Sequence, residues 1–180
     1  MFVKVCGLTE FEHIDWAVEM GYSAIGVVLH RKSPRFCTVD KARKLSNYAR
    51  NKILTVAVGI DFPEVEDVHN DFDFIQIYEP KKIDRLIFAG DYIPDGLDFK
   101  YFVYDISRGS GEFHMPPDWV KKISNRLIIS GGLNVDNIRD IISNYKCFGI
   151  DVSSGVEKPR GIKDRNLMKK FIEGVNNATR

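Results

Sequence analysis

Hydrophobic and polar positions alternate along the chain in a way that predicts repeated strand–helix units. Eight short apolar runs, rich in β-branched and aromatic residues, recur along the sequence. The third run is apolar almost throughout, which is typical of a strand buried on both faces of a parallel sheet. The expected strands are residues 2–6, 24–29, 53–60, 74–78, 86–89, 101–104, 126–130 and 148–152.

Amphipathic stretches with recognisable ends separate several of these runs. Thr9 and Glu12 have the spacing of a capping box, which predicts a helix start, and Gly21 is placed to end that helix. A second helix is expected to start at Thr38, and Asn134 and Asp164 can cap later helices. The chain is therefore expected to alternate strands and helices along its length.

Eight strands, each followed by a helix or a loop, predict an α/β fold: a compact (β/α)8 TIM barrel formed by residues 1–180 as one domain. The 180 residues leave about 22 per unit, enough for a short strand, a short helix and minimal loops. Helices 4 and 5 are expected to be shortened or missing, because Pro80, Gly90, Pro94 and Gly96 interrupt the pattern there. The alternative is an open, doubly wound sheet of about five or six strands.

Composition and charge narrow the class of protein. The 26 Lys and Arg against 25 Asp and Glu leave a net charge of +1, and 44% of residues are hydrophobic. These values are typical of a globular protein with a real core, and they argue against nucleic acid as the main partner. No apolar run reaches the roughly 18–20 residues that a membrane span needs, and no signal peptide is recognisable. We therefore expect a cytoplasmic protein.

Cysteines and histidines are scattered and form no metal-binding pattern. The three cysteines are Cys6, Cys37 and Cys147, and the four histidines are His13, His30, His69 and His114. Their spacings contain no C-x-x-C, H-x-H or H-E-x-x-H motif. The sequence predicts reduced thiols, no disulfide framework and no structural metal.

Three candidate reactive residues follow expected strands, where the functional groups of a parallel barrel lie. Cys6 ends the first strand and is either a reactive thiol or a small buried hydrophobic residue. Arg35 ends a cationic loop that suits a carboxylate or phosphate, unless the loop is a solvated charge run. Asp105 follows strand six and is either a general acid or a turn residue.

Small residues follow the last two expected strands. Ser130-Gly131-Gly132-Leu133 comes after strand seven, and Asp151-Val152-Ser153-Ser154-Gly155 ends strand eight. Small side chains let backbone N–H groups and a short helix N-terminus approach a phosphate, and these loops are the usual phosphate site of the fold. The sequence therefore predicts a phosphate site here.

These segments, in this order, resemble the phosphoribosylanthranilate isomerase family of (β/α)8 enzymes in tryptophan biosynthesis. The resemblance covers nearly the whole chain. It rests on Lys4-Val5-Cys6-Gly7-Leu8-Thr9, Ser33-Pro34-Arg35, Asp105 with Gly109-Ser110-Gly111, Ser130-Gly131-Gly132-Leu133-Asn134 with Asn137, and Asp151 to Glu157 with Gly161 and Lys163-Asp164. Two departures are Gln76-Ile77-Tyr78-Glu79, where the family usually reads Gln-Leu-His-Gly, and Arg108-Gly109 in place of a glycine pair.

The resemblance implies an isomerase that converts N-(5-phosphoribosyl)anthranilate to 1-(2-carboxyphenylamino)-1-deoxyribulose 5-phosphate by an Amadori rearrangement. Cys6 matches the family's general base and Asp105 its general acid. The positions that match substrate contacts are Arg35 for the anthranilate carboxylate, Asp151 for the sugar, and Gly132, Ser154 and Gly155 for the phosphate. No redox or metal chemistry is needed, so no cofactor is expected.

The expected partner is a small phosphorylated sugar substrate, with no nucleic acid and no membrane, and the chain is expected to be a monomer or homodimer. One alternative is a related isomerase of the histidine-pathway aminoaldose, although such enzymes usually use two aspartates. Another is a non-catalytic paralogue that binds phosphorylated sugars. Since a free thiol is mostly protonated at neutral pH, we expect Lys4 or a nearby helix N-terminus to favour the Cys6 thiolate, with an ionisation at roughly pH 6 to 9.

Overall fold

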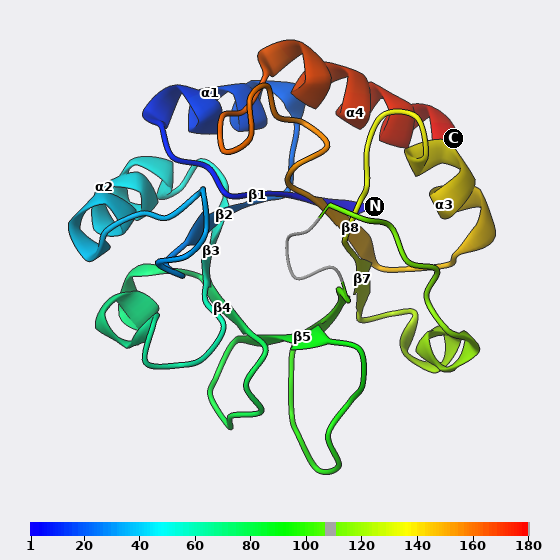
Figure 1. Cartoon of the computed structure of the whole chain (residues 1–180), viewed down its shortest axis with the longest axis horizontal. Helices are drawn as coiled ribbons and strands as arrows, with labels where there is room; N and C mark the ends of the chain where they lie inside the picture. The colour runs from blue at the N-terminus through cyan, green and yellow to red at the C-terminus, as the bar shows by residue number, and fades with distance from the viewer. Residues whose placement is uncertain (107–110, 180) are drawn as a thin grey trace.

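The chain folds into a closed barrel of parallel strands that follow one another in sequence order, with β8 pairing to β1 (Figure 1). The computed structural model describes residues 1–106 and 111–179. The strands are β1 (Phe2–Cys6), β2 (Ala24–Val28), β3 (Leu54–Val58), β4 (Phe74–Ile77), β5 (Leu86–Gly90), β6 (Tyr101–Tyr104), β7 (Leu127–Ile129) and β8 (Gly149–Val152). The predicted barrel is confirmed, and the open doubly wound sheet is wrong.

Helices cover the barrel unevenly. The α-helices of the described residues are α1 (Phe11–Met20), α2 (Val39–Ala49), α3 (Ile138–Asn144) and α4 (Arg165–Ala178), and the 3₁₀ helices are η1 (Glu66–Asp71) and η2 (Asp118–Ile123). No described helix follows β4 or β5, as predicted, and irregular segments border these strands (Figure 1). Ile83, Ile93 and Leu97 of those segments pack against the core instead. Within the described residues, no helix has the length and apolar character needed to cross a membrane.

The predicted capping box at the start of α1 is wrong. The helix begins at Phe11 after Glu10, which forms no side-chain capping bond. The reason lies in the preceding turn, where the N–H groups of Gly7 and Leu8 both donate to the carbonyl of Gly26 at 2.8 and 3.0 Å. These bonds tie the segment leaving β1 to β2, so the helix starts too late for Thr9 to cap it.

The other expected caps have mixed outcomes. Asp164 accepts from the N–H of Leu167 at 2.9 Å, as predicted. The helix expected to start at Thr38 begins one residue later, and Thr38 caps it by accepting from the N–H of Lys41 at 3.3 Å. Asn134 does not cap α3, which begins at Ile138. Its side chain instead accepts the N–H groups that follow it in a turn, those of Asp136 and Asn137.

Strand β1 shows how the barrel interior is layered. Its inward side chains are Phe2, Lys4 and Cys6 in order, while Val3 and Val5 belong to the outer core under the helices. Phe2 stacks with Phe148 at the N-terminal end, with ring centroids 5.3 Å apart. The alternation of the strand therefore carries Cys6 to the opposite, C-terminal end of the barrel.

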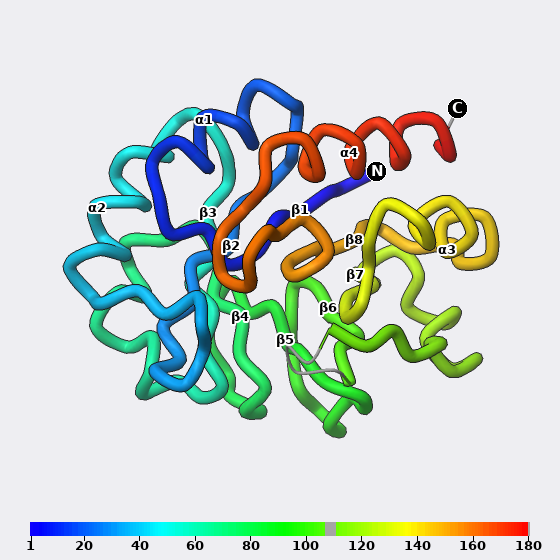
Figure 2. The backbone as a smooth tube through the Cα atoms, turned by 45° about the horizontal axis from the view of Figure 1, so that its top comes forward, coloured from blue at the N-terminus to red at the C-terminus, as the bar shows by residue number. Residues whose placement is uncertain are grey.

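The two ends of the chain meet on one side of the barrel. Figures 1 and 2 both show α4 lying beside α1, close to the N-terminal strand. The Tyr22 hydroxyl, just after α1, donates to the carbonyl of Met168 in α4 at 2.9 Å. This closure brings the loops after β8 next to those after β1 and β2.

Candidate active site

A cavity of about 110 Å³ lies at the C-terminal ends of the strands. It is lined by Cys6, Arg35, Asp105 and Asp151, which the sequence placed at four separate strand ends. A smaller hollow of about 40 Å³ adjoins it, and Arg35 and Asp105 border both. The structure therefore brings the candidate acid, base and cation to one place.

Cys6 sits above a buried ion pair. Lys4 Nζ lies 2.8 Å from Asp151 Oδ2, and both side chains are almost fully buried. Burial raises the pKa of the Cys6 thiol, and the nearby charge of Lys4 lowers it only in part. Lys4 thus lowers the pKa of Cys6, as expected. Burial has the larger effect, so the pKa in the free protein stays above its ordinary value.

Asp105 is held by the residue that departs from the family motif. Its Oδ2 accepts a hydrogen bond of 2.8 Å from the Tyr78 hydroxyl. Burial, together with the neighbouring Asp105, raises the pKa of Tyr78 well above its usual value, so the phenol stays protonated and donates. Arg108 and the Gly109-Ser110 motif lie outside the described residues.

Arg35 belongs to a buried charge network with Glu157 and Lys163. Its Nε and Nη2 donate to the two oxygens of Glu157 at 2.7 and 2.8 Å. Lys163 Nζ lies 2.6 Å from Glu157 Oε1, and the Gly161 N–H donates to Oε2 at 2.9 Å. Burial opposes ionisation of Glu157, but these contacts lower its pKa to about 2. Two cations thus share one carboxylate, which leaves positive charge at the cavity wall.

The glycine-rich loops after β7 and β8 are tied to each other. A Cβ on Gly155 would lie 1.9 Å from the carbonyl oxygen of Leu133, so only glycine fits there. Gly132 has φ +66°, and a Cβ there would lie 2.2 Å from the Phe113 nitrogen. Gly132 and Ser154 line the smaller hollow, whereas Gly155 lets the loops approach. The expected helix N-terminus is absent, because the described segment between β8 and α4 contains turns and bridges but no helix.

Several cavity residues were not assigned a role from the sequence. Gln76, on β4, buries a side-chain oxygen, Oε1, that has no hydrogen-bond partner among the described residues, and the same holds for Oδ1 of Asp151, which the resemblance had already assigned to the sugar. His30, two residues after β2, also lines the cavity, with Nδ1 2.7 Å from Glu64 Oε1. Their signal in the sequence was position alone: Gln76 is a polar residue in an apolar strand, and His30 directly follows one.

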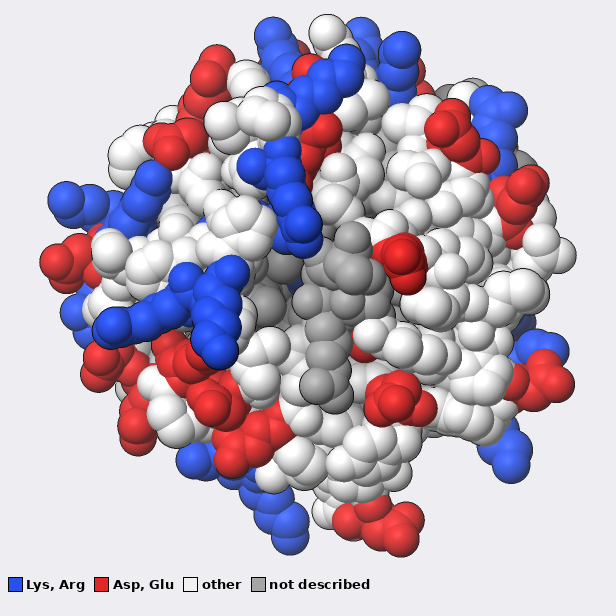
Figure 3. Space-filling model, viewed as in Figure 1, with Lys and Arg blue, Asp and Glu red and all other residues white. Residues whose placement is uncertain are grey.

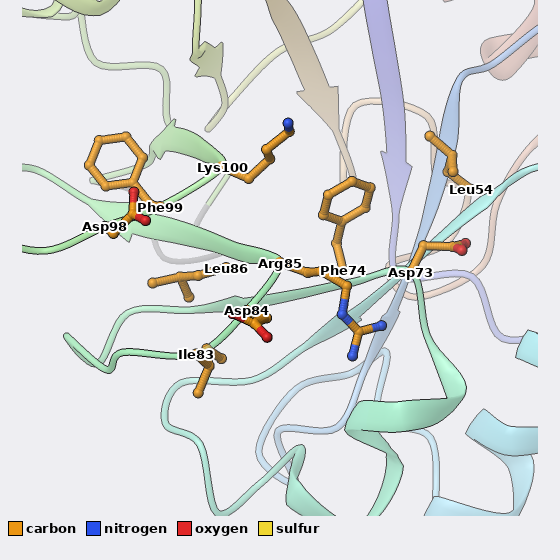
Figure 4. Close-up of a pocket in the computed structure, with 10 residues that line it drawn as sticks. All are labelled: Leu54, Asp73, Phe74, Ile83, Asp84, Arg85, Leu86, Asp98, Phe99 and Lys100. Carbon is orange, nitrogen blue, oxygen red and sulfur yellow. The ribbon is translucent and has the colours of Figure 1, made fainter.

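A larger pocket of about 500 Å³ lies at the other end of the barrel (Figure 4). It is lined by Leu54, Phe74 and Leu86, the first residues of β3, β4 and β5. In this fold the functional groups lie at the C-terminal ends of the strands, whereas residues at the N-terminal ends serve stability. The smaller cavity around Cys6 is therefore the candidate active site.

Basic side chains border the molecule's centre in the view of Figure 3. The loops after β2 and β8 carry the exposed cations Arg31, Lys32, Lys158 and Arg160. The two loops approach closely, since a Cβ on Gly161 would lie 2.8 Å from the carbonyl oxygen of Pro34. Positive charge at a cavity mouth favours an anionic ligand.

Comparisons with known proteins agree on one family. Residues 97–174 match the family model of N-(5'-phosphoribosyl)anthranilate isomerase. A relative of that name from Sulfurihydrogenibium sp. is 32% identical over 206 aligned positions, which cover 98% of this chain and 100% of the relative. Another, from Pseudomonas fluorescens, is 30% identical over 96% of this chain and 97% of its own length.

Solved structures of the same family share the fold. The phosphoribosylanthranilate isomerase of Thermotoga maritima superposes with a TM-score of 0.79 at 26% identity, covering 98% of this chain and 99% of that one. A second isomerase structure, in complex with reduced 1-(o-carboxyphenylamino)-1-deoxyribulose 5-phosphate, has a TM-score of 0.79 at 28% identity, with the same coverage. The barrel, its clustered strand-end residues and these relatives together lead to one conclusion: the chain belongs to the N-(5'-phosphoribosyl)anthranilate isomerase family.

Proposed function

We propose that this chain isomerises N-(5'-phosphoribosyl)anthranilate to 1-(o-carboxyphenylamino)-1-deoxyribulose 5-phosphate in tryptophan biosynthesis, with Asp105 as general acid and Cys6 as general base. The observation that carries the proposal is the single cavity lined by Cys6, Arg35 and Asp105, which come from distant parts of the chain. Its wall adjoins the glycine-rich loops after β7 and β8. A family member bound to the reduced product supports the same ligand.

The reaction needs one proton donor and one acceptor on the same sugar. Protonated Asp105 gives its proton to the furanose ring oxygen while the bond from that oxygen to C1 breaks, which leaves an iminium between C1 and the aryl nitrogen. The Cys6 thiolate then removes the proton from C2, and the electron pair forms the C1=C2 bond of an enolamine. The enolamine tautomerises to the ketone, and solvent exchange returns Asp105 and Cys6 to their starting protonation states.

The cavity offers complementary groups for each part of the substrate. The phosphate would lie against Gly132 and Ser154 in the smaller hollow, which the Arg35 cation also borders. The unpaired oxygens of Gln76 and Asp151 are acceptors and would take hydrogen bonds from sugar hydroxyl groups. A buried acceptor without a partner costs about 1–3 kcal/mol, so a ligand that supplies the donor gains affinity.

The aryl group would lie at the end of the cavity away from the glycine loops. Val28, Val58 and Ile60 provide an apolar wall there. Arg35 uses its Nε and Nη2 edge for Glu157, so it would bind the aryl carboxylate through its remaining N–H groups. This orientation sets the sugar between Cys6 and Asp105.

The test is the Asp105→Asn variant. Loss of the proton needed in the transition state should lower kcat by about 10²–10⁴-fold, while the Kd for the reduced product changes little. Turnover is followed by the loss of anthranilate-type fluorescence, and Kd by titration calorimetry. Asp98→Asn, at the other end of the barrel, is the control and should match the wild type.

Two results would contradict the proposal. A small and equal effect of Asp105→Asn on kcat and on binding would make Asp105 a structural residue. Binding of the reduced product by the wild-type protein, with no turnover of freshly made substrate, would identify a non-catalytic binder.

A further inference from the structure

His30 is a cavity residue that the proposed reaction leaves without a role. Its Nδ1 lies 2.7 Å from Glu64 Oε1, and the other oxygen of Glu64 accepts the N–H of Ile60 at 2.8 Å. Because a carboxylate only accepts hydrogen bonds, Nδ1 carries a proton and donates it to Glu64. Nε2 is on the opposite side of the ring from Nδ1, and His30 lines the cavity, so Nε2 is the ring nitrogen that a ligand there would meet.

The loop after β2 is built to present His30 together with Arg35. The Ser33 N–H donates to the carbonyl of His30 at 3.0 Å, and the Ser33 hydroxyl accepts the N–H of Arg35 at 3.1 Å. These bonds close a compact turn between the two residues. Both side chains line the cavity that also contains Cys6.

Arg35 has only part of its N–H groups left for a ligand carboxylate. Its Nε and Nη2 are engaged by Glu157, so the side-on, two-bond grip that includes Nε is already used inside the protein. A ligand carboxylate meeting the remaining N–H groups therefore has room for a further donor. His30, from the same loop, is placed to be that donor.

The lining of the two hollows separates the aryl end from the phosphate end. Arg35 borders both, whereas His30 contributes to the larger cavity and is absent from the described lining of the smaller one. Val28 and Val58, the apolar neighbours of His30 in that lining, suit an aromatic ring. A group bound by both His30 and Arg35 is therefore attached to the ring and not to the sugar phosphate.

We propose that His30, oriented by Glu64, is a second binding residue for the carboxylate of the aryl group, acting beside Arg35; this inference rests on the proposed function. The imidazolium form carries a proton on each nitrogen, so Nε2 can donate a charge-assisted hydrogen bond to the carboxylate while Nδ1 donates to Glu64. Glu64 is a positioning residue, since it acts through His30. Together they make the site selective for an ortho-carboxylated aromatic amine over the plain amine.

The test uses two stable ligands that differ only in the carboxylate. One is reduced 1-(o-carboxyphenylamino)-1-deoxyribulose 5-phosphate, and the other is the same compound with an unsubstituted phenyl ring. His30→Gln should weaken binding of the first by about tenfold or more and leave binding of the second within about twofold. The control is His69→Gln, a histidine of η1 that contacts the carbonyl of Glu66, and it should change neither Kd.

Glu64→Gln provides a second variant if His30→Gln does not fold. It should weaken binding of the carboxylated ligand by about threefold or more, because the imidazole loses its anionic partner. Binding of the phenyl ligand should again stay within about twofold. Equal weakening of both ligands, or no change in either, would overturn the inference. If the wild-type protein neither binds the carboxylated ligand nor turns over the substrate, it is the proposed function that fails.

Discussion

Cys6 lies next to a lysine and yet is harder to ionise than a thiol in water. From the sequence, Lys4 or a nearby helix N-terminus was expected to favour the Cys6 thiolate. Burial disfavours the charged thiolate, and this effect outweighs that of Lys4 and raises the pKa of Cys6. Lys4 is also committed to Asp151, so part of its field is cancelled.

The pH dependence of Cys6 alkylation tests this account of the thiol. Only the thiolate reacts with iodoacetamide, so a raised pKa moves the rise of the alkylation rate to higher pH. The rate at residue 6, followed by mass spectrometry, should keep increasing from pH 7 to beyond about pH 9. A rate that reaches its plateau below about pH 8 would contradict a raised pKa for Cys6.

Two cysteine variants assign the ionisation. Cys6→Ser should remove most of the activity together with the alkylation at residue 6, because a hydroxyl does not ionise in this range. Cys147 is the matched control: burial raises its pKa to about 11, and it does not line the cavity. Cys147→Ser should retain the wild-type profile.

At the scale of elements, the loops after β7 and β8 form one unit. Asn134 and Gly155 pair in an isolated β-bridge, and the Asn137 side chain donates to the carbonyl of Gly132 at 2.9 Å. The loops therefore support each other, although 21 residues separate Asn134 from Gly155 along the chain (155 − 134 = 21). Their shape depends on the absence of a side chain at the contact.

Gly155→Ala should disturb this unit. The added Cβ would meet the carbonyl oxygen of Leu133 at 1.9 Å, so the backbone must shift. Overpacking of this kind costs about 2 kcal/mol, which corresponds to a Tm lower by about 4–8 °C, and binding of the reduced product should weaken as well. Calorimetric scans and titrations measure both effects.

Gly90→Ala is the control for the glycine variant. A Cβ on Gly90 would have its nearest neighbours at 3.7 Å, which is ordinary contact, so Tm should change by less than about 2 °C. If both alanine variants behave alike, the close approach of the two loops does not determine the site.

At the scale of the whole molecule, Glu157 connects the early and the late parts of the chain. It binds Arg35, which lies 122 residues earlier, and Lys163, which precedes α4. The contact closes the seam where the last strand meets the first two. Its charges are almost fully buried, so removing one partner leaves the others without compensation.

Glu157→Gln should lower the free energy of unfolding by about 3 kcal/mol at pH 7. The pKa of Glu157 is lowered to about 2 in the folded protein from a reference of 4.5, so its contribution is complete above about pH 4.5 and is lost as the pH falls towards 2. The difference between variant and wild type should therefore shrink in acid. Denaturant unfolding at pH 7 and at about pH 3.5 measures it.

The control is Glu19→Gln, which removes an exposed ion pair with Arg165 that also joins the first and last helices. Exposed pairs contribute at most about 1 kcal/mol, so this variant should stay close to the wild type at both pH values. A loss at Glu157 that is the same at neutral and acid pH would show that shape, and not charge, is what the residue supplies.

The sequence by itself determined the strands, favoured the barrel over an open sheet, and indicated the strand ends that line the cavity. The expected runs agree with the eight observed strands to within two residues at each end, because burial on both faces leaves a local apolar signal. The proline and glycine positions between Tyr78 and Tyr101 likewise predicted that helices after β4 and β5 would be missing. The capping box of α1 failed because a contact with another strand overrode a local preference.

Only the tertiary structure decided which of these residues meet. Lys4 pairs with Asp151 across 147 positions, and Tyr78 binds Asp105 across 27. Such partners depend on how the strands are ordered and staggered when the barrel closes, and no local pattern records that. The same closure buries Cys6, ties Arg35 to Glu157 and turns His30 towards the cavity, which is why their electrostatics had to be read from the folded chain.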